Sequence, residues 1–268
     1  MRVAAVQLCV SDDRSDNLSR TRALIDAAAA QGVELVLLPE LFSVPFVQPD
    51  PDPTFFRWAE PLDGPSNAMA AAASAAHGIT VVSSIFEASE QAGVYHNTSV
   101  TYVGGEAVLT YRKSHLPFSN GFPEKFYFRP GHEPPTAVAA AGTRVGTIIC
   151  YERHFPELGR QVAKAGGTIL CVPVACASAP MREVFQLELR AQAIANGMFV
   201  MCANRIGTEV TKTYFGTSAV YDPDGTVLAA AEDHGGDELV VAEIDLDQVA
   251  RTRERRPFLR DLRPELYA

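Results

Sequence analysis

The sequence predicts an α/β fold, because strand-like and helix-like patterns alternate along most of its 268 residues. The run VELVLL at 33–38 is continuously apolar, which is typical of a strand buried on both faces of a sheet. Two halves built from such patterns flank a long connection at 114–143 that is rich in Pro, Gly and aromatic residues. Connections of this length within a compact domain are usually functional.

The first half is predicted from hydrophobic periodicity and from Gly and Pro breakers. Apolar residues at helical spacing follow Leu18, and Gly32 ends that helix. Gly104 and Gly105 separate two strand-like runs and predict a hairpin. The predicted elements are strands at 2–8, 33–38 and 79–86, helices at 18–30 and 65–76, a loop at 45–53, and hairpin strands at 97–103 and 107–111.

The second half repeats the alternation. Pro156 suits the first position of a helix, and DPDG at 222–225 is typical of a hairpin turn. The predicted elements are strands at 144–149, 168–172, 198–203 and 238–245, and helices at 157–165 and 182–196.

Composition narrows the class of protein. A hydrophobic fraction of 47% suits one large domain, which we predict at 1–268 with a C-terminal arm at about 246–268. The net charge of −9 disfavours nucleic-acid binding, for which a basic surface is expected. No apolar run reaches the roughly 18 residues of a membrane span, and the start MRVAAVQLCV is typical of a first strand.

The five cysteines are odd in number and form no CxxC pair. We therefore expect reduced thiols and a cytoplasmic protein. Cys171 and Cys176 are five residues apart and have no nearby pair of histidines, which is poor spacing for zinc. No metal site is predicted.

Three chemically different side chains follow predicted strands, namely Glu40, Lys113 and Cys150. Ligands of α/β sheets bind beyond the carboxyl ends of the strands. We therefore expect these side chains to converge in one crevice. Taken singly, each also suits an ordinary structural place: a turn glutamate, a lysine at a sheet edge and a core cysteine.

Each of the three side chains has a possible chemical role. Cys150 is a nucleophile candidate, since a thiol is readily activated. Glu40 can take the thiol proton and return it to a leaving amine. Lys113 can stabilise an oxyanion together with the backbone N–H of Tyr151. Such a site cleaves a C–N bond through a thioester.

The chain also resembles the nitrilase superfamily of carbon–nitrogen hydrolases across nearly its whole length. The matching segments, in family order, are VAAVQL, LLPELF around Glu40, YRKSHLP around Lys113, IICYERHFPE around Cys150, ANRIG, FGTSAVYDPDG and RRPFLRDLRPELY. This resemblance implies an αββα four-layer sandwich, a Glu–Lys–Cys triad, and neither metal nor organic cofactor. It also implies homodimers or larger homo-oligomers in which the C-terminal arm crosses to a neighbour; a solvated helix and arm is the alternative.

The resemblance implies a further glutamate near the triad. The segment GFPEKFYFRPG fits that part of the family, and its glutamate is Glu124. We expect Glu124 to position groups or to handle protons. The alternative is a surface carboxylate on a loop of variable length.

Several details resemble the N-carbamoyl amine and amino-acid amidohydrolases, of the β-ureidopropionase and N-carbamoylputrescine amidase type. They are RKSH, HNT at 96–98, EKFYFRPG and the pattern C-x-x-R-x-x-P-E. The resemblance implies that Arg153 meets a substrate carboxylate, and a planar guanidinium suits that task. Alternatively, Arg153 pairs with Glu152 or Glu157 and only shapes the turn.

Four more residues are candidates for substrate binding. His115 lies two residues after Lys113, and in a strand both would share one face. We expect His115 to bind a ureido oxygen or to fix Glu124, or else to be structural. The other candidates are His154, Asn204 and Arg205. For a cationic substrate tail, Asp50 and Asp52 are available in the Pro-rich loop.

The predicted function is hydrolysis of an N-carbamoyl amine or N-carbamoyl amino acid to the amine, carbon dioxide and ammonia. The alternative is an aliphatic amidase or ω-amidase that acts on a small primary amide. Two rivals lie outside this reaction class. One is a catalytically idle binding protein, and the other is a papain-like enzyme that pairs Cys150 with His154.

Overall fold

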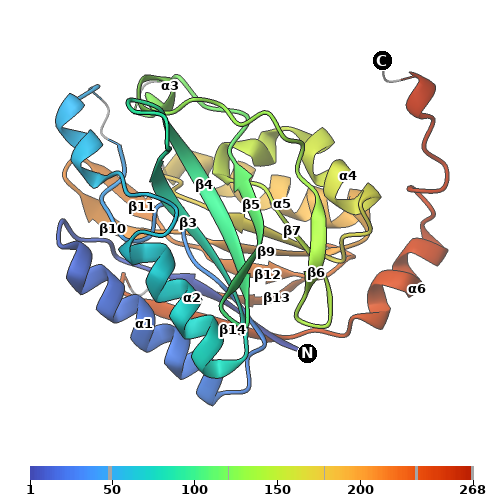
Figure 1. The fold of residues 1–268 in the computed structure, drawn as a ribbon. Helices are drawn as coiled ribbons and strands as arrows, with labels where there is room; N and C mark the ends of the chain where they lie inside the picture. The colour runs from blue at the N-terminus through green and yellow to red at the C-terminus, as the bar shows by residue number, and fades with distance from the viewer. Residues whose placement is uncertain (48–49, 120, 178, 233–234, 267–268) are drawn as a thin grey trace.

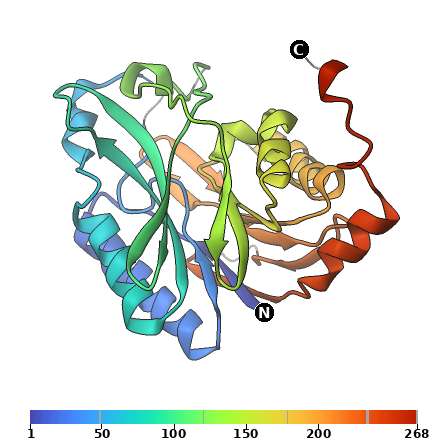
Figure 2. The same ribbon diagram turned by 45° about the vertical axis from the view of Figure 1, so that its right-hand side comes forward.

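The computed structural model describes residues 1–47, 50–119, 121–177, 179–232 and 235–266. Two six-stranded sheets lie face to face, and helices cover their outer faces. Figure 2 shows the resulting order of layers, helix, sheet, sheet and helix. The αββα sandwich implied by the resemblance is therefore confirmed.

The first sheet has the strand order β14-β1-β2-β3-β4-β5. β1, β2 and β3 are parallel, and β5 runs in the same direction because β4 is antiparallel to both of its neighbours. The carboxyl ends of β2 and β5 therefore meet at one edge. The elements of this half are β1 (Arg2–Gln7), α1 (Arg14–Ala30), β2 (Leu35–Leu37), η1 (Pro53–Trp58), α2 (Pro65–His77), β3 (Thr80–Ala88), β4 (Tyr95–Val103), β5 (Glu106–Arg112) and α3 (Glu124–Tyr127), with β14 (Glu238–Glu243) added from the end of the chain.

The second sheet has the order β13-β12-β9-β8-β7-β6, with β7, β8 and β9 parallel. β10 and β11 form a separate two-stranded hairpin. The elements are β6 (Ala137–Ala140), β7 (Thr143–Thr147), η2 (Cys150–His154), α4 (Pro156–Lys164), β8 (Ile169–Pro173), η3 (Ala179–Met181), α5 (Arg182–Asn196), β9 (Phe199–Ala203), β10 (Ile206–Glu209), β11 (Lys212–Phe215), β12 (Ala219–Tyr221), β13 (Val227–Ala230), α6 (Asp247–Arg255) and η4 (Pro264–Leu266).

Alternating side chains explain why both faces of each sheet are covered. On β2, Leu35 faces the core between the sheets, whereas Val36 packs in the cluster that includes α1 and α2. On β8, Cys171 faces the same inter-sheet core, and Leu170 packs with residues of α4 and α5. Apolar residues at every position of a strand thus supply two cores, as the continuous run at 33–38 predicts.

The connection at 114–143 contains more structure than the sequence predicts. It includes α3, and its end forms β6, which pairs antiparallel with β7. The AVAA sequence of β6 has little of the β-branched and aromatic enrichment that marks strands. Residue 120 of this connection and residues 48–49 of the predicted loop at 45–53 lie outside the described residues.

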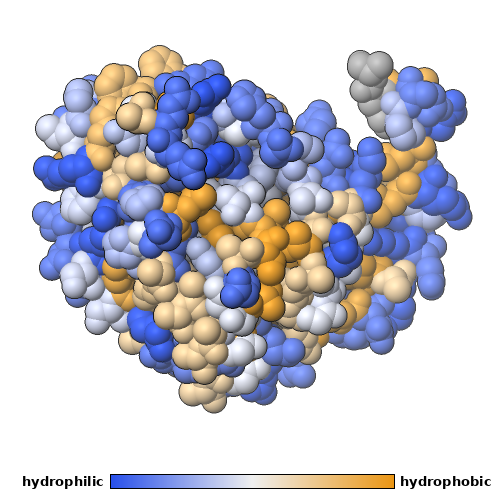
Figure 3. Space-filling view, viewed as in Figure 1, coloured by the Kyte–Doolittle hydropathy of each residue, from blue (hydrophilic) through white to orange (hydrophobic). Residues whose placement is uncertain are grey.

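The C-terminal arm begins with α6 and then runs along and away from the sandwich (Figures 1 and 2). Phe258 and Leu266 are 45% and 67% exposed. Figure 3 shows hydrophobic surface among hydrophilic side chains on this arm. Its docking on a partner subunit stays a prediction, and Tyr267 and Ala268 lie outside the described residues.

Among the helices of the described residues, none combines the length and the apolar character that crossing a membrane requires.

Candidate active site

Lys113 and Glu40 meet at the edge where β5 and β2 end. The Lys113 ammonium donates a hydrogen bond to Glu40 Oε1 at 2.7 Å. Both side chains are fully buried. Lys113 directly follows β5, and Glu40 lies three residues beyond β2, so the predicted convergence at strand ends holds for this pair.

Glu124 completes a cluster of one cation and two carboxylates. Its Oε1 and Oε2 accept hydrogen bonds from Lys113 Nζ at 2.9 and 2.8 Å, and the residue is 1% exposed. It is therefore no surface carboxylate. Glu124 begins α3, so this short helix carries the glutamate from the long connection to the end of β5.

Burial and charge shift the pKa values of this cluster. Burial raises the pKa of Glu124 to about 7, although the Lys113 charge opposes the rise. Burial alone lowers the pKa of Lys113, but the charges of Glu124 and Glu40 outweigh it and leave that pKa above its ordinary value. Lys113 therefore keeps its charge, and Glu124 changes charge near neutral pH.

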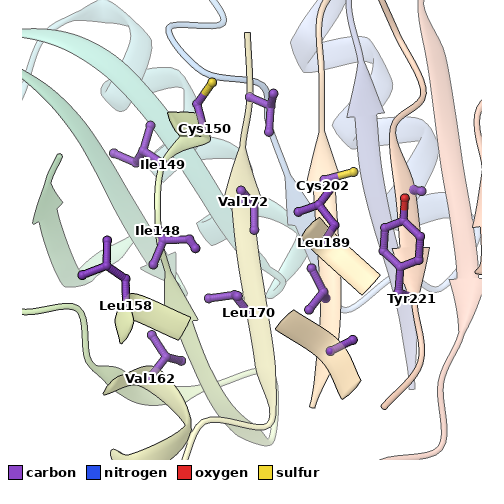
Figure 4. Packing of buried hydrophobic residues seen from close by; sticks show 14 of the residues in the cluster. Ile148, Ile149, Cys150, Leu158, Val162, Leu170, Val172, Leu189, Cys202 and Tyr221 are labelled. Carbon is purple, nitrogen blue, oxygen red and sulfur yellow. The ribbon is translucent and has the colours of Figure 1, made fainter. Parts of the chain in front are cut away.

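Cys150 sits on a turn and not at the end of a strand. β7 ends at Thr147, and Cys150 begins η2 with a φ of 46°. That left-handed conformation is uncommon for a residue with a Cβ and costs of order 1–3 kcal/mol. Figure 4 shows the Cys150 sulfur directed away from Ile148 and Leu158, which belong to the packed core.

The surroundings of Cys150 favour its protonated thiol. Burial and the charge of Glu40 raise its pKa well above the ordinary value, and Lys113 and Arg153 offset only part of the rise. Glu40 Oε2 is buried and has no hydrogen-bond partner among the described residues. A protonated thiol and an unoccupied carboxylate oxygen are the two partners that general-base catalysis needs.

A pocket of about 280 Å³ contains Cys150 and Glu124. Its walls combine apolar and polar side chains, as is typical of small-molecule sites. The lining residues are Pro117, Ser119, Phe122, Glu124, Cys150, Tyr151, Arg153, His154, Ala175, Cys176, Ala177 and Met181. Larger surface hollows of about 650 and 490 Å³ contain none of Glu40, Lys113 and Cys150. In the described part of the chain, no group of three or more His, Cys, Asp or Glu is placed to hold a metal ion.

Arg153 lines this pocket but is already engaged. Its Nε lies 2.9 Å from Oε2 of Glu188 on α5, and its Nη1 donates to the Cys150 carbonyl at 3.1 Å. Its Nη2 lies 3.8 Å from the sulfur of Cys176. The expected alternative pairing with Glu152 or Glu157 is therefore wrong, because the partner is Glu188.

His154 is the second predicted substrate-binding residue in the pocket wall. Its Nδ1 lies 2.5 Å from Glu188 Oε1, so Glu188 contacts both His154 and Arg153. The His154 side chain is 27% exposed and that of Glu188 is 24% exposed. His154 and Glu188 are thus the more solvent-accessible members of a charged group at the pocket.

His115 lies in a neighbouring hollow and not in the Cys150 pocket. Its ring packs on Phe155 with centroids 4.1 Å apart, and its Nδ1 is 2.8 Å from the Ser114 hydroxyl. The structure therefore does not bring His115 to Glu124, whose two oxygens accept from Lys113.

Asn204 and Arg205 follow β9 as predicted, but they hold the backbone behind the pocket. The Asn204 side chain accepts from the Cys176 N–H and donates to the Gly216 carbonyl. Arg205 is fully buried and donates to the carbonyls of Glu40, Leu41 and Val44. Neither residue lines the pocket, because their polar groups are used by backbone groups and, for Arg205, also by the Glu209 carboxylate.

The two aspartates that could bind a cationic substrate tail also lie outside the Cys150 pocket. Asp52 caps η1 by accepting from Thr54, and Asp50 is exposed. Neither lines the pocket.

Three residues of the site are not predicted from the sequence. Asn97 on β4 donates to Glu40 Oε1 at 2.7 Å, and its segment HNT indicates only a resemblance. Cys176 and Glu188 carry no sequence signal that places them in the site. Glu188 sits in the middle of a helix, where a glutamate gives no sign of a distant partner.

Comparisons with known proteins identify the family of the chain. The family model described as carbon-nitrogen hydrolase matches residues 2–254. The N-carbamoylputrescine amidase of Arabidopsis thaliana is 31% identical, over 99% of this chain and 93% of that protein. The citrullinase of Francisella tularensis is 31% identical, over 100% and 96%. Omega-amidase NIT2 of Danio rerio is 33% identical, also over 100% and 96%.

A solved carbon-nitrogen hydrolase from Helicobacter pylori G27 has the same fold. It superposes with a TM-score of 0.94 at 30% identity, covering 100% of this chain and 97% of that one. The family match and these relatives identify an enzyme that hydrolyses C–N bonds in amides. The chain therefore belongs to the carbon–nitrogen hydrolase family of the nitrilase superfamily.

Proposed function

We propose that the protein hydrolyses the C–N bond of an N-carbamoyl amine or N-carbamoyl amino acid through a Cys150 thioester. The observation that carries this proposal is the buried cluster of Lys113 with Glu40 and Glu124, together with Cys150 in a pocket beside it. The printed names of two relatives, N-carbamoylputrescine amidase and citrullinase, support a ureido substrate.

In the first half of the proposed reaction, Cys150 sulfur attacks the ureido carbon while Glu40 Oε2 takes the thiol proton. The carbonyl oxygen becomes an oxyanion, which the Lys113 ammonium and the Tyr151 N–H stabilise. When the C–N bond breaks, Glu40 gives its proton to the departing amine. An S-carbamoyl group then remains on Cys150.

In the second half, Glu40 takes a proton from water, and the hydroxide attacks the S-carbamoyl carbon. The C–S bond breaks, and the sulfur recovers a proton from Glu40. The released carbamic acid decomposes to carbon dioxide and ammonia, so one water is consumed for each substrate. Glu124 serves by holding the Lys113 ammonium toward the oxyanion.

The substrate tail follows the thioester site in the direction of Arg153 and His154. A free guanidinium would favour a carboxylate tail. Here Arg153 is paired with Glu188, so the ion pair itself is neutral. A zwitterionic or uncharged substrate tail suits this ion pair better than a simple anion does, because Arg153 and Glu188 can then stay paired with each other.

A primary amide is the alternative substrate. The same nucleophile, base and oxyanion donors act on R–CO–NH2, with ammonia as the leaving group. The relative named omega-amidase NIT2 favours this alternative.

An ammonia-release assay tests the proposal. The substrates are N-carbamoyl-β-alanine, N-carbamoylputrescine, citrulline, N-carbamoyl-D- and L-amino acids, propylurea and short aliphatic amides. We expect turnover of ureido compounds and none with Cys150→Ala. Turnover of primary amides alone would establish the alternative, and no turnover of any compound would overturn both.

A further inference from the structure

Glu152 is a buried carboxylate that the proposed reaction does not use. Its side chain is fully buried. Oε1 accepts hydrogen bonds from the Tyr111 hydroxyl at 2.7 Å, the Ser114 N–H at 2.8 Å, the Ser114 hydroxyl at 2.7 Å and the His115 N–H at 3.3 Å. Oε2 accepts from the Ile149 N–H at 2.7 Å.

The two oxygens of this carboxylate serve two different turns. The donors to Oε1 include the two residues that follow Lys113 at the end of β5. The donor to Oε2 is the residue directly before Cys150. Because β5 and β7 belong to different sheets, one side chain ties the turn of the lysine to the turn of the nucleophile.

In these contacts the Glu152 carboxylate acts as a fixed anion that accepts hydrogen bonds. Among the described residues, the basic group paired with Glu152 is His115, whose Nδ1 lies 3.9 Å from Oε1 on a side chain that is 39% exposed. A buried carboxylate must be compensated, and here three backbone N–H groups and two hydroxyls do so. Hydrogen bonds to an ionised acceptor are the strong kind, and those from backbone N–H groups hold main chain.

The Cys150 turn needs such support. Cys150 is held at a φ of 46°, a conformation that persists only when its surroundings enforce it. Glu152 anchors the N–H on one side of Cys150, and Arg153 holds the Cys150 carbonyl on the other. Glu152 therefore links the backbone directly before Cys150 to the residues that follow Lys113.

We propose that Glu152 is a positioning residue that sets the spacing between the Lys113 ammonium and the Cys150 sulfur across the two sheets. The proposal rests on the proposed function, since it assigns catalytic roles to those two groups. Displacement of reacting groups by about 1 Å can cost roughly 100-fold in rate.

The variant Glu152→Gln tests this positioning role without changing the size of the side chain. Glutamine has nearly the same shape but only one acceptor oxygen, so in either orientation its NH2 faces N–H donors of one turn. We expect kcat per active site to fall roughly 10- to 100-fold, with KM changed by less than about threefold, because Glu152 does not line the pocket. Glu157→Gln is the matched control, an exposed glutamate on α4, and should keep full activity.

The readouts distinguish positioning from mere stability. Active sites are counted by iodoacetamide labelling of Cys150 followed by intact-mass analysis, and kcat is expressed per labelled site well below the melting temperature. A purely structural role would lower the melting temperature and the number of sites but leave kcat per site unchanged. That result, or kcat per site within twofold of wild type, would overturn the proposal.

A second variant tests the proposal if Glu152→Gln does not fold. The double variant Tyr111→Phe, Ser114→Ala removes two hydroxyl donors from Oε1 and leaves the carboxylate in place. We expect at least about a threefold loss in kcat per site, and no loss would overturn the proposal. If wild type hydrolyses nothing, the proposed function fails; the pH dependence of Cys150 labelling in Glu152→Gln, which we expect to differ from wild type, then still tests the positioning role.

Discussion

The Lys113 ammonium and Glu40 Oε1 lie 2.7 Å apart with both side chains fully buried, whereas Glu40 Oε2 has no partner among the described residues. One oxygen of this carboxylate is thus fixed, and the other is free to accept a proton. Because the raised pKa keeps the Cys150 thiol protonated, this free oxygen is where we expect the proton to go.

Replacement of the nucleophile tests the covalent step. Cys150→Ala should lower turnover at least about 10⁴-fold on every substrate, because no other group in the site forms the thioester. Cys176→Ala is the matched control, since Cys176 is a second thiol in the same pocket. Ammonia release measures both variants, and substantial turnover by Cys150→Ala would contradict the assignment.

Replacement of the base tests the role of Glu40. Glu40→Gln should fold, because Lys113 keeps its pairing with Glu124. We expect kcat to fall roughly 10²- to 10⁴-fold, the usual contribution of a general base. Rapid-quench mass spectrometry should find no build-up of the Cys150 adduct. Normal formation of that adduct would show that a different group takes the thiol proton.

Lys113 should be essential for stability as well as for activity. Lys113→Met leaves two buried carboxylates without their cation, which typically costs about 3–5 kcal/mol. Urea unfolding followed by circular dichroism measures this change in the free energy of unfolding. Lys164→Met, on the exposed end of α4, should change it little. A small change in the free energy of unfolding for Lys113→Met would mean that Glu40 and Glu124 are not both ionised in the folded protein.

The raised pKa of Glu124 predicts a pH-dependent stability difference. The folded protein keeps the Glu124 proton up to about pH 7, whereas the unfolded chain releases it near the ordinary value of 4.5. Rising pH between these values therefore favours the unfolded wild type. Glu124→Gln lacks this titration.

Melting temperatures of wild type and Glu124→Gln should therefore diverge with pH. We expect the variant to gain stability relative to wild type from pH 5 to pH 8 and no further above that. A difference that is constant with pH would show that Glu124 is ionised throughout. Ammonia release should meanwhile fall, because glutamine offers Lys113 one acceptor oxygen in place of two.

Glu188 should control the charge preference of the pocket. Glu188→Gln removes the anion that pairs with Arg153 and His154, which frees the guanidinium for a substrate carboxylate. We expect the ratio of kcat/KM for N-carbamoyl-β-alanine over N-carbamoylputrescine to rise about tenfold, the effect of one hydrogen bond to a charged group, which contributes roughly 1.5 kcal/mol. Glu183→Gln, exposed on the same helix, is the control. An unchanged ratio would place the substrate tail elsewhere.

Much of the fold could be predicted from the sequence, because side-chain alternation and helical spacing act within a few residues. The apolar run at 33–38 identified a strand covered on both faces, and Gly and Pro marked the ends of several helices. β6 escaped prediction because its alanines carry little strand preference, and only pairing with β7 makes it a strand.

The sequence by itself also determined which residues were chemically able to form the site, through the ordered motifs around Glu40, Lys113 and Cys150. Tertiary structure alone decided what each polar group contacts. Arg153 pairs with Glu188, and Arg205 is buried against backbone carbonyls behind Glu40. Glu152 links two sheets. These contacts depend on how the sheets and helices pack against one another. Packing brings together residues that are far apart in the sequence, and no sequence periodicity indicates which of them will meet.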